Sequence, residues 1–329
     1  MIEHGFEIID FHSHFPVPTD FSGRQSPGPE TEKREHLTKA RSEESKKILS
    51  DYAQKLRAEW RLAHGFHAPE TEEMSDEELA EKWSKEVDRY GIDKVVFVTG
   101  GGNERLANIV SRYPDKFIGF AHHNPHEKGA DNLLRKSVTE MGLRGYKIIA
   151  PALDTPIDHP SAYPTWEAAA DLEIPVLIHF GVLGGGGGVS HHVNMSPLSL
   201  HNVARDFASV QFVIPHLGCG YVRELLHLMW SCPNVHVDTS GSNQWIRWMP
   251  EEITVKSLLR KYLETVGHER IIFGSDSSWF PRGFSLRYFE DQVRDLRELN
   301  ASNDQMEAIF NGFDYAVVCL LYTSDAADE

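Results

Sequence analysis

Cysteine is scarce in this sequence. The chain has three cysteines, Cys219, Cys232 and Cys319, which is an odd number at wide and unpatterned spacing. This argues against a disulfide framework and against a zinc site made of thiolates. Any metal bound by this protein is therefore expected to have nitrogen and oxygen ligands.

Basic residues are outnumbered by acidic ones, and long apolar runs are absent. Lys and Arg number 33 against 49 Asp and Glu, giving a net charge of −16, and no stretch gathers the basic residues into a stripe. We therefore expect neither nucleic acid nor an acidic membrane surface as a partner. No apolar run approaches the roughly 20 residues that a membrane helix needs, and no signal-peptide pattern is present. These features predict a soluble, cytoplasmic protein.

The last residues of the sequence differ in character from the rest. Residues 319–329, "CLLYTSDAADE", resemble the reading-frame translation of a sequencing-library transposon adapter. We therefore expect a non-native, adapter-derived tail and exclude it from the interpretation of the fold. An ordinary frayed tail is the alternative. If the adapter interpretation is right, a natural C-terminal segment is missing from this sequence.

Short β-rich apolar runs alternate with stretches of helical periodicity along the remaining chain. Their near-continuous apolar character is typical of parallel strands buried on both faces. Strand followed by helix, repeated eight times, favours a (β/α)8 TIM barrel over an open doubly wound sheet. We therefore predict an α/β fold with a single barrel domain over residues 1–318. The predicted strands are 6–11, 94–100, 116–121, 142–150, 174–180, 210–216, 234–240 and 269–276. The predicted helices include 103–113, 130–141, 162–172, 199–208, 221–230 and 285–299.

A long insertion interrupts this alternation after the first strand. Residues 19–89 are far more than a usual strand-to-helix connection requires. The segment begins with turn-forming residues, continues as a charged helix-like stretch over about 31–63, and ends in a helix that starts near Ser75 with an acidic first turn. We expect the insertion to cover the barrel mouth, as a lid or an oligomer contact. A disordered linker is the alternative.

Polar residues with metal-binding chemistry fall at the ends of four predicted strands. His12 and His14 lie two residues apart at the end of the first strand and so point to the same face. His179, His216 and Asp276 end the fifth, sixth and eighth strands. Barrel enzymes place their sites at this end. Buried imidazole and carboxylate groups without partners would cost several kcal/mol, whereas a divalent cation would satisfy them. The pair of histidines alone is a weak signal, because such a pair is more often structural or incidental.

The motifs "DFHSH", "IHF", "PHLG" and "FGSD", in this order on strands one, five, six and eight, resemble the amidohydrolase superfamily. The sequence is most similar to its branch of metal-dependent hydrolases and decarboxylases, which includes aminocarboxymuconate-semialdehyde decarboxylase. The resemblance implies that His12, His14, His179 and Asp276 bind one divalent metal, Zn²⁺ in most members, with Mn²⁺ as the alternative. It further implies that His216 is a general acid/base or an electrophile facing the substrate, and barrels of this branch often form homodimers. A bound cation would acidify its water, and Asp276 could both bind the cation and accept a proton from that water.

Other residues near the strand ends are candidates for substrate binding. Lys147 lies near the position where two-metal members of the superfamily carry a bridging carboxylated lysine, but pairing with a substrate carboxylate is the other interpretation. Arg282 can clamp a carboxylate through two parallel hydrogen bonds, and Trp279 lies in the same loop; a surface arginine is the alternative. His123 follows the third strand and faces either the pocket or the outside. Asp238 ends the seventh strand, where it either contacts substrate or caps a turn.

Three functions are compatible with these residues. The first is a hydrolase that uses metal-activated water on an ester, lactone or amide of a small organic acid. The second is a non-oxidative decarboxylase, or hydratase, of a small unsaturated or aromatic carboxylic acid. The third is a barrel that binds a metal or ligand without turnover. We expect the hydrolase, because metal–water chemistry is the commonest activity of the superfamily.

Overall fold

The computed structural model describes residues 5–17, 42–70, 74–181 and 192–311. The predicted tail at 319–329 and the part of the insertion at 19–41 lie outside these ranges. No helix in the described ranges is long and apolar enough to cross a membrane. The strands are β1 (Ile9–His14), β2 (Lys94–Thr99), β3 (Phe117–Gly119), β4 (Ala121–His122), β5 (Tyr146–Ile149), β6 (Val176–His179), β7 (Phe212–Ile214), β8 (Val235–Asp238) and β9 (Ile271–Ile272).

The strands are parallel and follow one another around the molecule in chain order. β1, β2 and β3 form one sheet, and β4 to β9 form another. Only Phe120 separates β3 from β4, so together they are the third predicted strand. After β9, the backbone N–H of Phe11 donates to the carbonyl of Phe273 at 3.2 Å, and that of Asp276 donates to the carbonyl of His12 at 2.7 Å. The last strand therefore returns to the first, as the predicted barrel requires.

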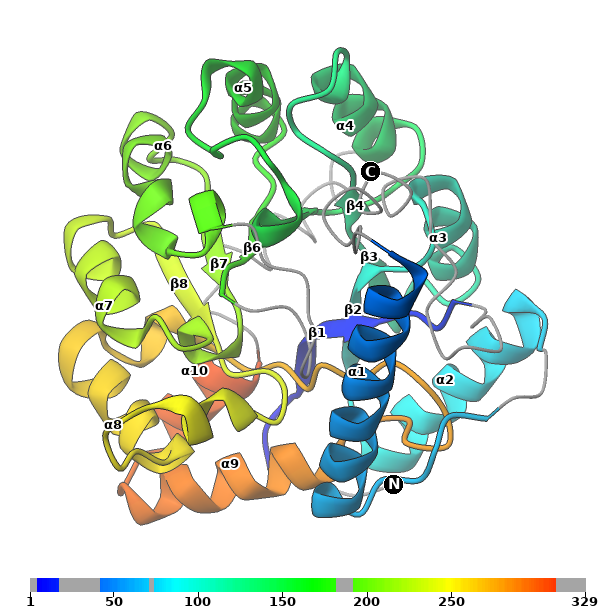
Figure 1. The fold of residues 1–329 in the computed structure, drawn as a ribbon, viewed down its shortest axis with the longest axis vertical. Helices are drawn as coiled ribbons and strands as arrows, with labels where there is room; N and C mark the ends of the chain where they lie inside the picture. The colour runs from blue at the N-terminus through cyan, green and yellow to red at the C-terminus, as the bar shows by residue number, and fades with distance from the viewer. Residues whose placement is uncertain (1–4, 18–41, 71–73, 182–191, 312–329) are drawn as a thin grey trace.

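Helices surround the strands (Figure 1). Six of them begin and end within a few residues of the predicted ranges, so apolar periodicity was a sufficient guide to these six. They are α3 (Asn103–Val110), α4 (Ala130–Thr139), α5 (Tyr163–Asp171), α6 (His201–Asp206), α7 (Val222–Ser231) and α9 (Leu286–Glu298). Two further helices, α8 (Val255–Val266) and α10 (Asn303–Phe310), lie outside those ranges.

The buried apolar side chains form two layers. The smaller cluster takes residues from strands all around the ring and fills the barrel interior; it comprises Ile9, Phe11, Val96, Val98, Ile118, Phe120, Leu177, Val213 and Ile272. The larger cluster lies between the strands and the helices. This division shows which face of each strand points inward.

A register shift in β1 brings its two histidines inward. Ile9 and Phe11 belong to the interior cluster, so strict alternation would direct His12 outward. The pairing of β1 with β2 instead shifts between Asp10 and Ser13, which is the behaviour of a β-bulge. Because of this shift, His12 and His14 also face the interior.

The insertion after β1 contains two helices, α1 (Glu43–His64) and α2 (Asp76–Tyr90). As predicted, Ser75 starts α2, and it forms a capping box with Glu78. Trp83 of α2 is fully buried, and its ring lies 5.3 Å from that of Phe97 in β2. α2 therefore packs on the barrel wall.

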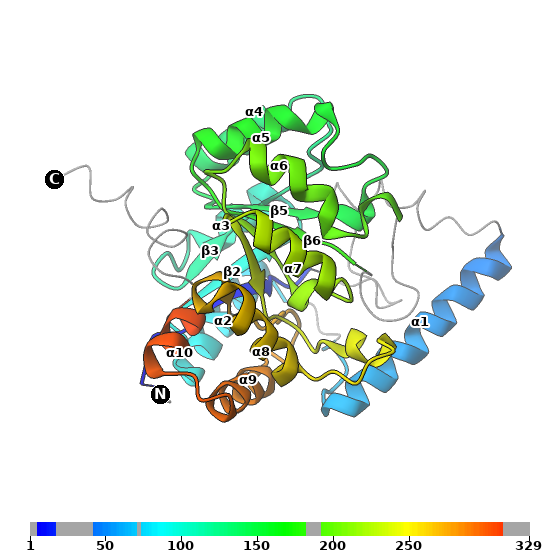
Figure 2. The same ribbon diagram turned by 90° about the vertical axis from the view of Figure 1, so that its left-hand side faces the viewer.

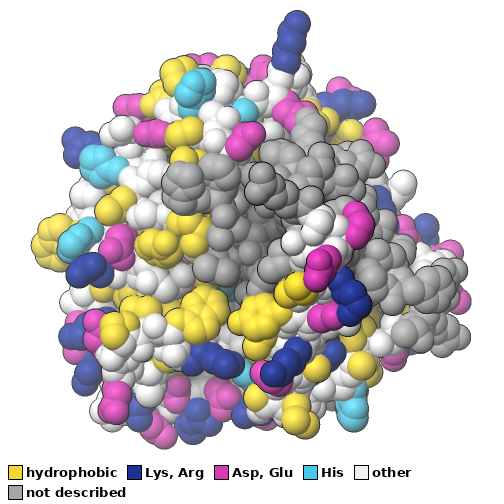
Figure 3. Space-filling view, in the orientation of Figure 1, with side chains coloured by type: hydrophobic (Ala, Val, Ile, Leu, Met, Phe, Trp, Pro, Cys, Tyr) yellow, Lys and Arg dark blue, Asp and Glu magenta, His cyan; other side chains and the backbone are white. Residues whose placement is uncertain are grey.

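α1 meets the barrel through its C-terminal end. Trp60 Nε1 donates to Ser242 Oγ at 3.0 Å in the loop after β8, and the Trp60 ring lies 5.6 Å from that of Trp279 in the loop after β9. Figure 2 shows the other end of α1 standing away from the barrel, and Figure 3 shows the face of the molecule seen in Figure 1 with its side chains filled in. The insertion thus touches two loops that follow strands.

Candidate metal centre

Three of the predicted ligands, His12, His14 and Asp276, meet at the carboxyl ends of the strands, and His179 lies next to His216 beside them. The His12 ring lies 5.1 Å from those of both His14 and His216, and the rings of His179 and His216 are 4.9 Å apart. His14 Nε2 lies 3.2 Å from Asp276 Oδ1. One atom each of His12, His14 and Asp276 lie within 4.8 Å of one another, a spacing that can hold a metal ion. Side chains that are far apart in the sequence therefore form one polar cluster.

Hydrogen bonds decide which ring nitrogens of these histidines face the cluster. His12 Nδ1 lies 2.8 Å from Asp238 Oδ2, and His14 Nδ1 lies 2.7 Å from Thr99 Oγ1. The Nε2 atoms of His12 and His179 are buried and have no hydrogen-bond partner among the described residues. Metal-binding histidines commonly use one nitrogen for the ion and the other for such a partner. The residues present therefore fit a divalent cation.

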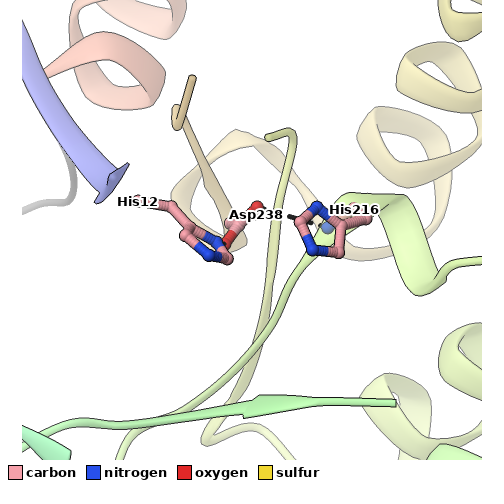
Figure 4. A group of neighbouring side chains, drawn as sticks. All are labelled: His12, His216 and Asp238. Atoms are coloured by element: carbon pink, nitrogen blue, oxygen red, sulfur yellow. Dashed lines mark hydrogen bonds and ion pairs between the residues drawn. The ribbon is translucent and has the colours of Figure 1, made fainter. Parts of the chain in front are cut away.

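A second group of neighbouring side chains, His12, His216 and Asp238, also has ligand atoms within 4.8 Å of one another (Figure 4). Within this group, His12 Nδ1 lies 2.8 Å from Asp238 Oδ2, which is the distance of a hydrogen bond. Asp238 is fully buried. Its carboxylate contacts His12 Nδ1 and the backbone N–H of His216. These contacts leave the unpartnered Nε2 of His12 available.

The electrostatics of the cluster favour the charge states that bind a cation. Burial lowers the pKa of His12 to about 3 and lowers that of His179 well below its usual value. Burial would raise the pKa of Asp276, but its hydrogen bond with His14 and the neighbouring histidines hold it below the usual value. At neutral pH the cluster therefore contains neutral imidazoles and an ionised carboxylate, which are the forms that bind metal.

Lys147 lies within the barrel beside this cluster. It pairs with Leu177 of the interior cluster, and only 1% of its surface is exposed. Its positive charge is one of the causes that lower the pKa of His12, His14 and His179. The predicted position of Lys147 at the site is thus observed, and its role is taken up below.

Arg282 and Trp279 lie against one another next to Asp276. The guanidinium carbon of Arg282 lies 3.8 Å from the centroid of the Trp279 ring, within the range of a cation–π contact. Arg282 Nη2 donates to the carbonyl of Asp276 at 2.6 Å and to Ser278 Oγ at 3.2 Å. This nitrogen is therefore already bonded, and a substrate carboxylate would have to use the other nitrogens of Arg282.

His123 lies apart from the cluster. Its Nε2 bonds with the carbonyl of Ala130 at 3.0 Å, and its ring packs 4.8 Å from that of Tyr146. Tyr146 belongs to the layer between the strands and the helices. Tyr146 and Lys147 are successive residues of β5, so the side chain of Tyr146 points outward where that of Lys147 points inward. His123 packs against this outward side, and we therefore withdraw it from the predicted substrate-binding residues.

Sequence reasoning overlooked one buried carboxylate, that of Asp10. It accepts hydrogen bonds from Ser13 Oγ at 2.7 Å and from the backbone N–H of Ser275 at 2.8 Å. Burial raises its pKa to about 6. Asp10 therefore joins β1 to the segment after β9 that carries Asp276. The sequence signal that could have identified Asp10 is its position as an acidic residue inside an apolar strand.

The parallel barrel, with a cluster of imidazoles and carboxylates at the carboxyl ends of its strands, defines a class of barrel proteins whose side chains fit a divalent cation. The sequence itself matches the profile of the Amidohydrolase family over residues 9–312. Since that match covers nearly the whole chain, the protein belongs to the amidohydrolase family, a family of metal-dependent enzymes. The predicted resemblance is confirmed.

A match to one curated protein is much shorter. Protein fluG of Emericella nidulans is 29% identical over 121 residues, which are 36% of this chain and 13% of that protein. The chain thus spans a small part of the length of this relative.

Solved structures share the fold at low sequence identity. An uncharacterised TIM-barrel protein from Bordetella bronchiseptica has a TM-score of 0.61 at 20% identity, with 96% of this chain and 99% of that chain covered. A probable 2-pyrone-4,6-dicarboxylic acid hydrolase from Acinetobacter baumannii has a TM-score of 0.58 at 16% identity, with 96% and 99% covered. The 5-carboxyvanillate decarboxylase of Novosphingobium aromaticivorans has a TM-score of 0.61 at 16% identity, with 97% of both chains covered. These similarities confirm the TIM-barrel fold.

Proposed function

We propose that this protein is a hydrolase that acts with one divalent metal on an ester, lactone or amide of a small organic acid. The observation that carries the proposal is the pair of buried Nε2 atoms, on His12 and His179, that have no partner among the described residues. Leaving such polar atoms unpaired in a protein interior is costly. A cation held by these atoms, with His14 and Asp276, would remove that cost.

The ligand set suits the chemistry of hydrolysis. Neutral imidazoles with one carboxylate are typical of Zn²⁺ sites, and Mn²⁺ accepts the same ligands. When bound, the cation would polarise a carbonyl and acidify a water molecule. Asp276, beside His14 at 3.2 Å, would accept a proton from that water.

His216 would move a second proton. Its Nδ1 lies 3.2 Å from the carbonyl of Ser240, and a carbonyl can only accept a hydrogen bond. A proton on Nδ1, which also lies 2.9 Å from Ser240 Oγ, would leave Nε2 for the substrate. In this role His216 takes a proton from the attacking water and returns it to the leaving group as the bond to the carbonyl carbon breaks.

The substrate is proposed to carry a carboxylate. The Acinetobacter hydrolase was crystallised with citric acid, and the Novosphingobium decarboxylase with manganese and 4-hydroxy-3-methoxy-5-nitrobenzoic acid. In this chain, buried Lys147 offers a positive charge within the barrel, and Arg282 with Trp279 forms the wall beside Asp276. We assign the substrate carboxylate to Lys147 or to the other nitrogens of Arg282, because each places a positive charge beside the cluster.

Non-oxidative decarboxylation of a small unsaturated or aromatic acid is the alternative. The similar structures include both a hydrolase and decarboxylases, and the same cluster can hold a cation for either reaction. In a decarboxylase, His216 would donate the proton that replaces the departing carbon dioxide.

Two measurements test the proposal in sequence. Metal analysis of protein purified without chelators should find about one divalent ion per chain; about two would make Lys147 a bridging ligand, and none after reconstitution would contradict the proposal. Lactones and unsaturated acids are then screened by product mass. Hydrolysis adds the mass of water, whereas decarboxylation removes that of carbon dioxide. Asp276→Asn is the control, since it removes a ligand while nearly preserving shape.

A further inference from the structure

Asp238, at the end of β8, is outside the proposed ligand set but contacts the proposed ligand His12 and the proposed acid/base His216. We propose that Asp238 is a positioning residue that orients His12 toward the metal and at the same time fixes the backbone of His216. This inference rests on the proposed function, since it assigns His12 and His216 the roles given above.

The two carboxylate oxygens of Asp238 have separate partners. Oδ2 lies 2.8 Å from His12 Nδ1. Oδ1 accepts the backbone N–H of Ser240 at 2.8 Å and that of His216 at 3.3 Å. The side chain has no solvent exposure. Asp238 thus joins the end of β1 to the loop that carries His216.

The contact with His12 selects the form of its ring. An ionised carboxylate can only accept a hydrogen bond, so His12 Nδ1 must carry the proton. The lone pair is then on Nε2, the atom that is buried without a partner among the described residues. A carboxylate behind a metal-binding histidine has this orienting effect in metal sites generally. Asp238 therefore prepares His12 to be a ligand.

The contact with His216 holds an unfavourable backbone conformation. His216 has a φ of +59°, which residues other than glycine adopt at a cost. Its N–H is bound by Asp238, and its carbonyl accepts a hydrogen bond from Trp245 Nε1 at 3.0 Å. The peptide groups on both sides of the strained residue are therefore held.

Ser240 completes the connection between the two rings. Its Oγ lies 3.1 Å from His12 Nδ1 and 2.9 Å from His216 Nδ1. The Ser240 backbone is itself fixed by Asp238 Oδ1. Loss of the Asp238 carboxylate would thus disturb both histidines, whereas loss of the Ser240 hydroxyl would leave the His12–Asp238 bond in place.

The same geometry argues against Asp238 as a metal ligand. A cation next to Asp238 would have to replace its bond with His12 Nδ1, and it would then leave the His12 Nε2 still unpaired in the interior. Placing the cation at Nε2 satisfies the unpaired atom and preserves every hydrogen bond of Asp238.

The test compares Asp238→Asn with Ser240→Ala and with Asp171→Asn, which removes an exposed carboxylate on α5. In Asp238→Asn, the carbonyl oxygen of the new amide can still accept from the two backbone N–H groups, so the fold should survive. The amide N–H₂ would face His12 Nδ1 and favour the wrong tautomer. We expect the metal dissociation constant, measured by competition with a chromogenic chelator, to rise about 10- to 100-fold in Asp238→Asn. It should change less than about threefold in the other two variants, because the His12–Asp238 bond remains in both.

The second readout needs no metal. Spectra of ¹⁵N-histidine in the metal-free protein report the tautomer of His12 directly, and Asp238→Asn should move the proton from Nδ1 to Nε2. An unchanged tautomer together with an unchanged dissociation constant would overturn the inference while leaving the proposed metal site intact. Loss of the absorption bands of bound Co²⁺ at saturation would make Asp238 a ligand and would also overturn it. If the substitution changes the tautomer and the wild type binds metal but yields neither product, only the proposed function fails.

Discussion

Protonation of a buried histidine outside the proposed ligand set should couple stability to pH. His236 in β8 is 3% exposed, its Nε2 bonds with Gln211 Oε1 at 2.7 Å, and it pairs with Val213 of the barrel interior. Burial, with a smaller effect of the Arg270 charge, lowers its pKa to about 3. The folded protein therefore keeps His236 neutral at pH values where the unfolded chain protonates it.

The direction and size of the effect follow from these two pKa values. Below an unfolded pKa of about 6.5 the unfolded chain binds a proton that the folded protein does not bind, so the free energy of unfolding falls as the pH decreases. The loss continues down to the folded pKa of about 3. Between pH 7 and pH 5, His236 alone should cost about 2 kcal/mol.

Urea unfolding of the wild type and of His236→Gln at both pH values measures this cost. Glutamine can still donate to Gln211 but does not titrate, so the variant should lose about 2 kcal/mol less than the wild type between pH 7 and pH 5. Both samples contain chelator. The metal-site histidines then lower the free energy of unfolding equally in both proteins, so their contribution cancels in the comparison. His227→Gln, at an exposed position on α7, is the matched control and should keep the wild-type loss. Equal losses in wild type and His236→Gln would refute the reasoning.

Three further predictions concern the site and the end of the chain. Asp276→Asn and His179→Ala should each lose stoichiometric metal together with activity, since each removes a proposed ligand; metal retained at full occupancy on elemental analysis would remove that residue from the set. His216→Asn should keep the metal but lower kcat about 10²- to 10⁴-fold, and an unchanged rate would exclude a role in proton transfer. Deleting residues 319–329 should change neither metal content nor folded yield, and a large loss of soluble protein would show that the tail belongs to the fold.

The barrel and its helices could be predicted because their signals are local. Apolar runs identify the buried strands, and the α9 helix is evident from periodicity over 285–299. The histidines and Asp276 could be placed because parallel strands bring their carboxyl ends to one edge. His179 illustrates this: its position at the end of β6 was enough to predict that it lies in the same cluster as His12.

Contacts that depend on the details of pairing could not be predicted. The shift in β1 between Asp10 and Ser13 has no sequence signal, although it brings His12 to the inside face. The bond between His12 and Asp238 joins residues 226 positions apart, and a turn-forming neighbourhood made a capping role for Asp238 equally plausible from the sequence. The side that His123 faces was left open for a related reason, since one residue decides which side of a strand end a ring occupies.

The metal site and the closure of the barrel depend on the same pair of strands. The backbone N–H of Asp276 donates to the His12 carbonyl, and that of His14 donates to the Ser277 carbonyl, both at 2.7 Å. A cation between His14 and Asp276 would therefore also join the first strand to the last. Because such a cation binds the folded state, it should raise the free energy of unfolding by about 2.7 kcal/mol at about 100 times its dissociation constant. Asp276→Asn should lose this stabilisation in thermal unfolding with and without metal, whereas His216→Asn should retain it. Equal stabilisation of both variants would mean that the cation is not held between these strands.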